Sequence, residues 1–244
     1  MTQTLPLKVG WLGPSLPTSS HIRKFAALVP PEVEVVYDQL ILHQGVLQDV
    51  QGKSEMIVAR AVDFTRVRRL DGLIFPGAPR EVYNPGLFAA FSSALSIPVT
   101  TALRASAAAL KTFNARRVLL LTPFDAALTQ LIREFLSQFD IAAVSPSEIL
   151  GHYTDALAMN ANDVVSYAER AMAEQKGIDA IYFQGAVLDP VDCLEKMESE
   201  LKVPVIASNP AMLWHMLSRL GKRSPLAGYG KLLASWPAII DLLN

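Results

Sequence analysis

Two segments of the chain resemble each other closely enough to indicate an internal duplication. The first reads Asp71-Gly-Leu-Ile-Phe-Pro-Gly-Ala78 and is followed by Ile97-Pro-Val-Thr100. The second reads Asp179-Ala-Ile-Tyr-Phe-Gln-Gly-Ala186 and is followed, at nearly the same spacing, by Val203-Pro-Val-Ile206. Each copy is typical of a buried strand that ends in a Gly-Ala turn, then a helix and a second buried strand. Because a duplicated α/β chain tends to bind its ligand between the halves, the sequence predicts a site where the two turns meet.

The rest of the chain follows the same alternation of apolar, strand-like runs with helical patterns, which is typical of parallel βαβ architecture. The pattern predicts two four-stranded parallel sheets flanked by helices, with a cleft between two pseudo-symmetric halves. One half is expected to contain residues 1–101 and 219–244, and the other residues 102–218. Ser54 is expected to cap a helix that runs to about Leu70, and Asp125 one that runs to about Phe139.

Composition and charge exclude several classes of protein. The net charge of −1 over 244 residues gives no electrostatic case for binding nucleic acid or acidic lipid. The N-terminus lacks the pattern of a signal peptide, and no apolar run is long enough to span a membrane. The lone cysteine, Cys193, excludes an internal disulfide and a cysteine-based zinc cluster, and no histidine pair with metal-ligand spacing occurs. We therefore expect a cytoplasmic protein without a metal site; a homo-oligomer is compatible with the sequence, which does not decide the oligomeric state.

The candidate binding residues lie at the carboxyl ends of the predicted strands, where open parallel sheets bind their ligands. They are Pro14, Ser15, Gly77, Ala78, Phe124, Gln184, Gly185, Ala186, Ser208 and Asn209. A glycine at a strand-to-helix turn allows positive φ and leaves backbone amides pointing at an anion. Two such turns facing each other could hold a small carboxylate, although a glycine also simply packs a tight turn.

Few acid or base groups accompany these positions. His152 and Tyr153, with Asp155, form a cluster in a polar loop, for which exposed loop residues are the alternative interpretation. Arg80 and Glu81 follow the first turn, where an arginine could grip a carboxylate or simply begin a solvated helix. The helical histidines, His21 and His215, are expected to be structural, and Cys193 is expected to be a small buried residue inside a helix.

Several segments carry a family resemblance that spans nearly the whole chain. They are residues 97–101 with the Ala-rich helix that follows, and residues 115–124, 179–186, 203–210 and 228–233. Together they resemble the aspartate/glutamate racemase superfamily, most closely its arylmalonate decarboxylase and maleate cis-trans isomerase group. The resemblance implies two Rossmann-like halves around a central cleft, activity as a lyase or isomerase on a small carboxylate, and no metal or organic cofactor. It also implies a catalytic cysteine at one or both Gly-Ala turns, where the racemases have two, and the arylmalonate decarboxylases keep the second to protonate an enediolate.

This chain departs from that pattern at the decisive positions. The cysteine positions of the family correspond to about Ala78 and to Gln184, and hydroxyl donors of the decarboxylases are replaced at Ala78-Pro79 and at Phe124. Pro14-Ser15 and Ser208-Asn209 still match. Two hypotheses follow: a cofactor-independent decarboxylase- or isomerase-like enzyme that does not use the cysteine pair, or a catalytically silent carboxylate-binding homologue or partner subunit.

Overall fold

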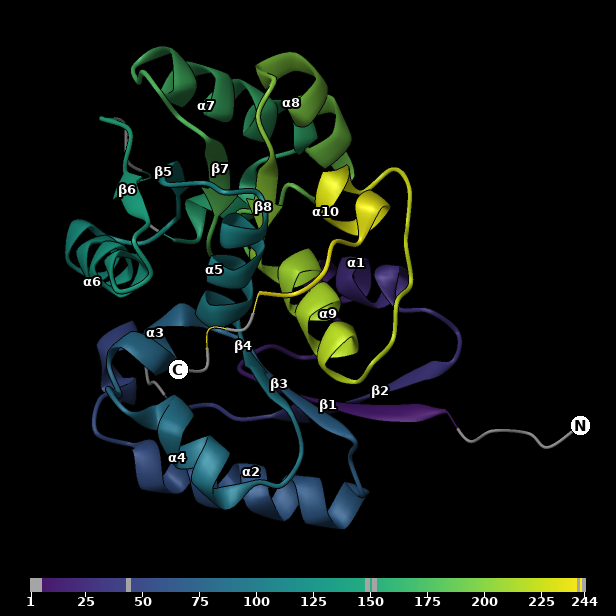
Figure 1. The fold of residues 1–244 in the computed structure, drawn as a ribbon. Helices are drawn as coiled ribbons and strands as arrows, with labels where there is room; N and C mark the ends of the chain where they lie inside the picture. Colours follow the sequence, from purple (N-terminus) through teal and green to yellow (C-terminus); the bar gives the residue numbers. More distant parts are fainter. Residues whose placement is uncertain (1–5, 43–44, 148–149, 151–152, 241, 243–244) are drawn as a thin grey trace, which may run out of the picture.

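The computed structural model of the chain describes residues 6–42, 45–147, 150, 153–240 and 242. None of the helices within these ranges is both long and apolar enough to cross a membrane. The described chain folds into two parallel sheets, one above the other in Figure 1, with helices between and around them.

The first sheet is built from the N-terminal part of the chain. It consists of β1 (Leu7–Gly13), β2 (Val33–Gln39), β3 (Gly72–Phe75) and β4 (Val99–Thr101). All its strands are parallel, in the order β2-β1-β3-β4.

The second sheet repeats this topology. It consists of β5 (Arg117–Leu121), β6 (Ala142–Val144), β7 (Ala180–Phe183) and β8 (Val205–Ala207), in the order β6-β5-β7-β8. β3 and β7, the strands of the duplicated motif, therefore occupy equivalent places in separate sheets. This confirms the predicted fold class of two four-stranded parallel α/β halves.

Ten α-helices and three short 3-10 helices connect the strands within the described residues. The α-helices are α1 (Ser20–Leu28), α2 (Ser54–Arg68), α3 (Ala78–Val82), α4 (Leu87–Ala94), α5 (Ala102–Thr112), α6 (Ala126–Ser137), α7 (Ala161–Ala173), α8 (Leu194–Leu201), α9 (Ser208–Arg219) and α10 (Gly230–Ser235). The 3-10 helices are η1 (Leu47–Val50), η2 (Asp155–Ala158) and η3 (Val191–Cys193).

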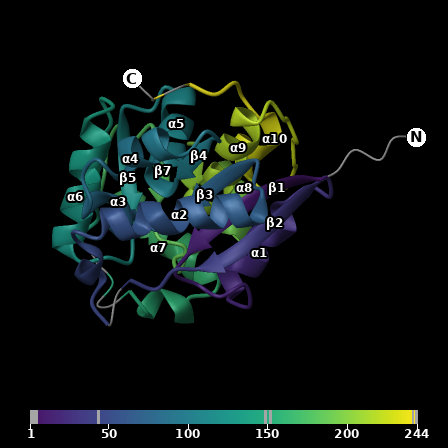
Figure 2. The ribbon, with the colours of Figure 1, turned by 90° about the horizontal axis from the view of Figure 1, so that it is seen from below.

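The strands divide their side chains between the two faces of each sheet. In β3, Leu73 and Phe75 join a cluster under α2 and α4, whereas Ile74 points into the central core. In β7, Ile181 and Phe183 face the helices on the far side, whereas Tyr182 faces the centre. The period of two thus buries both faces of each sheet. Figure 2, seen from below, shows α2 crossing the outer face of the first sheet.

The central core joins the two halves through α5 and α9, which directly follow β4 and β8 and pack along each other (Figure 1). Ala105, Ala107, Ala108 and Ala109 of α5 are fully buried, and their small side chains let the helices approach closely. Inner-face residues of both sheets belong to one hydrophobic cluster with these helices. The halves are therefore packed against each other over a shared core.

The helix ends agree with the sequence-based predictions at some positions and differ at others. Asp125 caps α6 as expected, because its Oδ1 accepts a hydrogen bond from Leu128 N at 2.8 Å. The expectation for Ser54 is wrong: it is the first residue of α2, and Lys53 precedes it as the cap. Two helices, α3 and α4, stand where one was predicted, since Gly86 at φ 85° breaks the helical path between them. The tail helix α10 packs on α8, α9 and β8; the assignment of residues 219–244 to the first half stays a prediction.

Candidate functional site

Two glycines shape the turns that follow β3 and β7. Gly77 has φ 97° and Gly185 has φ 110°, conformations that residues with a side chain rarely adopt. A Cβ on Gly185 would lie 2.8 Å from Pro123 Cδ, whereas one on Gly77 would meet Arg80 Cδ at 3.4 Å. Both turns need glycine for backbone conformation, and Gly185 also needs it for space.

A cavity of about 260 Å³ lies where the two turns meet. All the predicted binding residues except Ala78 line it: Pro14, Ser15, Gly77, Phe124, Gln184, Gly185, Ala186, Ser208 and Asn209. Ala78 is buried behind the turn at 1% exposure. The topology therefore brings together strand ends that are far apart in the sequence.

The weak acid–base candidates separate in the structure. Arg80 and Tyr153 line the cavity, whereas Glu81 lies in a different pocket beside Phe88 and Arg104. Asp155 is exposed at the start of η2. His152 lies outside the described residues.

Arg80 is a buried cation on the cavity wall. Its side chain donates hydrogen bonds to the carbonyl oxygens of Leu12, at 3.1 Å, and of Leu40, and it lies 5.0 Å from the ring of Phe75. Burial lowers the pKa of Arg80 to about 10, so the guanidinium keeps its charge at neutral pH. Among the described residues no carboxylate forms an ion pair with it. The solvated-helix interpretation of Arg80 and Glu81 is wrong, since their exposures are 3% and 7%.

Glu81 anchors the short helix that follows the first turn. Its Oε1 accepts a hydrogen bond from Arg104 Nε at 3.0 Å, and Arg104 stacks on the ring of Phe88 at 4.0 Å. Burial is the main cause that raises the pKa of Glu81, while the Arg104 charge opposes it. The pair joins α3 to α5 and so holds the Gly77 turn in place.

Replacing Arg104 with methionine is expected to destabilise the protein by about 3 kcal/mol, because it leaves the carboxylate of Glu81 buried without a cation. Since burial raises the folded-state pKa of Glu81, the loss should be smaller below the ordinary glutamate pKa and grow as the pH rises towards neutrality. Urea denaturation at pH 4 and pH 7 measures this. The double variant Glu81→Leu with Arg104→Met should recover most of the loss; equal loss in both variants would contradict the pairing.

His21, which the sequence predicts to be structural, is among the residues that line the cavity. The residue lies in the first turn of α1, is 8% exposed and lines the cavity. Burial lowers the pKa of its imidazole. A signal was present in the sequence: the helix that follows a parallel strand begins at the carboxyl edge of the sheet, where sites form. His215 is different, because it is buried outside the cavity lining and its Nδ1 lies 2.8 Å from Thr100 Oγ1.

Two polar atoms on the cavity wall are buried without a hydrogen-bond partner among the described residues. Trp11 Nε1 is a donor and Asn209 Oδ1 is an acceptor. A buried polar group without a partner costs about 1–3 kcal/mol. A ligand that offers an acceptor to Trp11 and a donor to Asn209 would remove that cost. Gln184, in contrast, already accepts a hydrogen bond from the Tyr182 hydroxyl through Oε1.

Comparison with known proteins decides the family. The model of the arylmalonate decarboxylase family matches residues 76–233, a stretch that contains both turns, Arg80 and α9. The chain belongs to the arylmalonate decarboxylase family. Arylmalonate decarboxylase of Bordetella bronchiseptica is 24% identical over 225 residues, which cover 91% of this chain and 88% of that protein.

Solved structures of three similar proteins have the same fold as this chain. A crystal structure of arylmalonate decarboxylase has a TM-score of 0.77 at 21% identity, covering 93% of this chain and 99% of that one. The maleate isomerase Iso from Pseudomonas putida has a TM-score of 0.74 at 18% identity, covering 94% and 99%. A structure of Nocardia farcinica maleate cis-trans isomerase with a covalently bound succinylcysteine intermediate has a TM-score of 0.73 at 17% identity, covering 94% and 98%.

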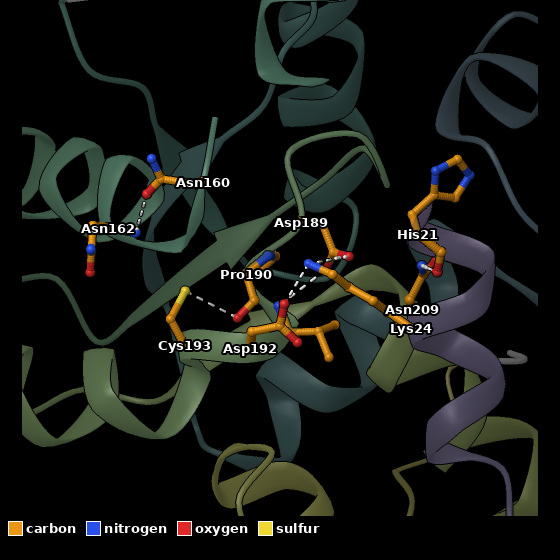
Figure 3. Close-up of polar contacts among 10 residues, drawn as sticks. His21, Lys24, Asn160, Asn162, Asp189, Pro190, Asp192, Cys193 and Asn209 are labelled. Atoms are coloured by element: carbon orange, nitrogen blue, oxygen red, sulfur yellow. Dashed lines mark hydrogen bonds and ion pairs between the residues drawn. The ribbon is translucent and has the colours of Figure 1, made fainter. Parts of the chain in front are cut away.

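The single cysteine of this family member lies away from the cavity. Cys193 is buried as the last residue of η3, just before α8 rather than inside a longer helix as expected, and its Sγ donates to Pro190 O at 3.3 Å (Figure 3). It does not line the cavity. Burial first, and then the charges of Asp192 and Asp189, raise the pKa of the thiol to about 11. The described residues also contain no group of three side chains suited to holding a metal ion.

Cys193→Ser is therefore expected to leave turnover and carboxylate binding within about threefold of the parent. With a thiol pKa of about 11, only about one cysteine in a thousand is ionised at pH 8. Mass spectrometry after iodoacetamide treatment of the native protein should show little labelling, whereas the urea-unfolded protein serves as the fully labelled control. Fast labelling that a carboxylate prevents would contradict this position for the thiol.

Proposed function

We propose that the protein is an enzyme that acts on a small carboxylate in the cavity between the two turns, as a decarboxylase or isomerase that does not use a cysteine pair. Membership in the arylmalonate decarboxylase family supports the decarboxylase- or isomerase-like class. The observation that carries the proposal is Arg80, a buried guanidinium on the cavity wall without a carboxylate partner among the described residues. A buried cation of this kind favours an anionic ligand.

The ligand's carboxylate is proposed to lie between Arg80 and the Gly77 turn. The Arg80 guanidinium has five N–H donors. Two of them bind the backbone carbonyls of Leu12 and Leu40, and the remaining N–H groups can donate to a ligand. Trp11 lines the same cavity, and its indole N–H, which has no partner among the described residues, is proposed as a neutral donor. Each hydrogen bond to a charged group contributes about 1.5–3 kcal/mol.

The rest of the cavity favours loss of a second carboxylate. Ile22, Phe124 and Met212 contribute apolar walls to the cavity, and Phe124 lies beside the Gly185 turn. A carboxylate held against such walls is poorly solvated, whereas the carbon dioxide that forms from it is uncharged. Decarboxylation of a malonate with an apolar or aromatic substituent is therefore the reaction that we favour. Maleate isomerisation is the second candidate reaction, because structures of maleate isomerases share the fold.

Two measurements test the proposal with the intact protein. Calorimetry with phenylmalonate and maleate should detect binding, and proton NMR should detect phenylacetate or fumarate formed from them. Binding without any turnover would support the alternative, a silent carboxylate-binding homologue or partner subunit. No binding of either dicarboxylate would contradict both.

A further inference from the structure

His21 stands out because the cavity otherwise offers few groups that exchange protons near neutrality. Among the described residues, the other titratable side chains on the wall are Arg80 and Tyr153. Imidazole has an ordinary pKa near 6.5, so it can hold or release a proton at neutral pH. Gln184, which also lines the cavity, has a carboxamide that does not titrate in this range.

The helix that carries His21 is fastened to the other half of the molecule. Lys24, one turn further along α1, places its Nζ 2.7 Å from Asp192 Oδ2 and 3.6 Å from Asp189 Oδ2 (Figure 3). Both acidic residues belong to the segment that runs from the Gly185 turn to η3. Asp189 Oδ1 is held in turn by the backbone N–H of Val191 at 3.1 Å. The ion pairs therefore fix α1 relative to the segment that follows the Gly185 turn.

A second contact lies closer to the histidine itself. Asn209 Nδ2, at the start of α9, donates to the backbone oxygen of His21 at 3.5 Å. Asn209 also lines the cavity, so the residue that holds the His21 backbone lines the same cavity as His21. The backbone of His21 is thus held at the boundary between the halves by a contact from the second half.

We propose that His21 is the proton carrier of this site, in place of a thiol, and that Lys24, Asp189 and Asp192 position it. The inference rests on the proposed function and adds the residue that transfers the proton. Its basis is the cavity lining, which includes His21 and not Cys193, and the contacts between α1 and the second half.

The step balances without any further reactant. The bond between the α-carbon and one carboxylate breaks, carbon dioxide leaves, and the electron pair forms an enediolate with the remaining carboxylate. The imidazolium of His21 then gives its N–H proton to the α-carbon and becomes neutral imidazole. It recovers a proton from water before the next turnover.

Ligand charge would control the protonation of His21. In the free site, burial lowers the pKa of His21 and favours neutral imidazole. A malonate dianion carries two negative charges, of which the Arg80 guanidinium balances one, and the remaining charge favours imidazolium. Among the described residues, the other charged and titratable groups around α1 are Arg80 and Tyr153 on the cavity wall, Arg23 and Lys24 on the helix, and the paired Asp189 and Asp192. Binding should therefore raise the pKa of His21.

Variants of His21 and Lys24, with phenylmalonate as the probe, test the inference. His21→Gln should lower the decarboxylation rate at least 100-fold, while the phenylmalonate Kd, measured above the pKa of His21 in the complex, changes less than about threefold. His215→Gln, outside the cavity, is the matched control and should keep the rate within about threefold. Lys24→Met should lower kcat about tenfold with little change in KM and should shift the pH profile, and Lys24→Arg should restore both.

NMR titration of the imidazole gives a readout that does not depend on turnover. The His21 resonance, assigned by its loss in His21→Gln, should titrate about one pH unit or more higher with phenylmalonate bound. Parental turnover in His21→Gln, or an unchanged His21 pKa on binding, would overturn the role of His21 and leave the proposed function standing. A parent that binds phenylmalonate without releasing carbon dioxide would overturn both the role of His21 and the proposed decarboxylase, in favour of a silent carboxylate binder. A parent that binds neither phenylmalonate nor maleate would contradict the binder as well.

Discussion

Replacing Arg80 with methionine is expected to weaken phenylmalonate binding by about 10- to 100-fold. The guanidinium is the buried cation on the cavity wall, and loss of one charge-assisted hydrogen bond costs about 1.5–3 kcal/mol. Methionine keeps most of the side-chain volume over the Gly77 turn, so the cavity should keep its shape. Calorimetry with phenylmalonate measures the change in Kd.

Arg133 provides a matched control for that substitution. Its Nε donates to the backbone oxygen of Ala143 at 2.9 Å, much as Arg80 binds two carbonyls, but it does not line the cavity. Arg133→Met should bind phenylmalonate like the parent, and Arg80→Lys should bind with intermediate affinity because it keeps the charge without the planar fork. If folded Arg80→Met binds as tightly as the parent, the carboxylate does not use this cation.

The second large effect is expected at Gly185. Its φ of 110° strains any residue with a Cβ by about 1–3 kcal/mol, and the added Cβ would lie 2.8 Å from Pro123 Cδ and 3.0 Å from Pro123 Cγ. Pro123 lies two residues after Leu121, the last residue of β5, so the strand limits how far it can shift. Gly185→Val should lower the melting temperature and weaken phenylmalonate binding at least tenfold. Thermal unfolding and calorimetry measure the two effects.

A Gly177→Val variant serves as a control that has the backbone strain of Gly185→Val without its steric clash. It also has positive φ, at 65°, but an added Cβ would have no heavy atom within 4 Å, and it does not line the cavity. Gly177→Val should lose some stability and keep parental affinity. Equal affinity in Gly185→Val and Gly177→Val would show that the second turn does not contact the carboxylate.

In this proposal the ligand's carboxylate binds to residues of the first half, and the proton comes from His21, which lies where the two halves meet. Arg80 and the Gly77 turn follow a strand of the first sheet. Gly185 and Asn209 follow strands of the second sheet, and Lys24 of the first half pairs with Asp192 of the second. Catalysis would then depend on how the halves are held together. Mutations of Lys24, Asp189 or Asp192 should affect kcat more than binding, and mutations of Arg80 should affect binding more than kcat.

The fold followed from the sequence because period and repetition are local properties. Leu73 and Ile181 lie in runs whose side chains are buried on both faces of a sheet, and such runs are visible as continuous apolar stretches. The duplicated Gly-Ala turns also predicted where the cavity would lie. The start of α2 at Ser54 and the break between α3 and α4 at Gly86 were harder to predict. The end of a helix depends on which of several neighbouring residues first adopts helical backbone angles.

The roles of individual site residues required the tertiary structure. Arg80 and Glu81 are adjacent in the sequence, yet one faces the cavity and the other pairs with Arg104, because a short helix turns successive side chains in different directions. His21 has a helical pattern around it that is equally consistent with a core position. Its place on the cavity wall depends on α9 and on the segment after Gly185, which lie far away along the chain. Local sequence determined the strands, the turns and the family; the distances between side chains from separate halves were decided only when the two sheets packed over their shared core.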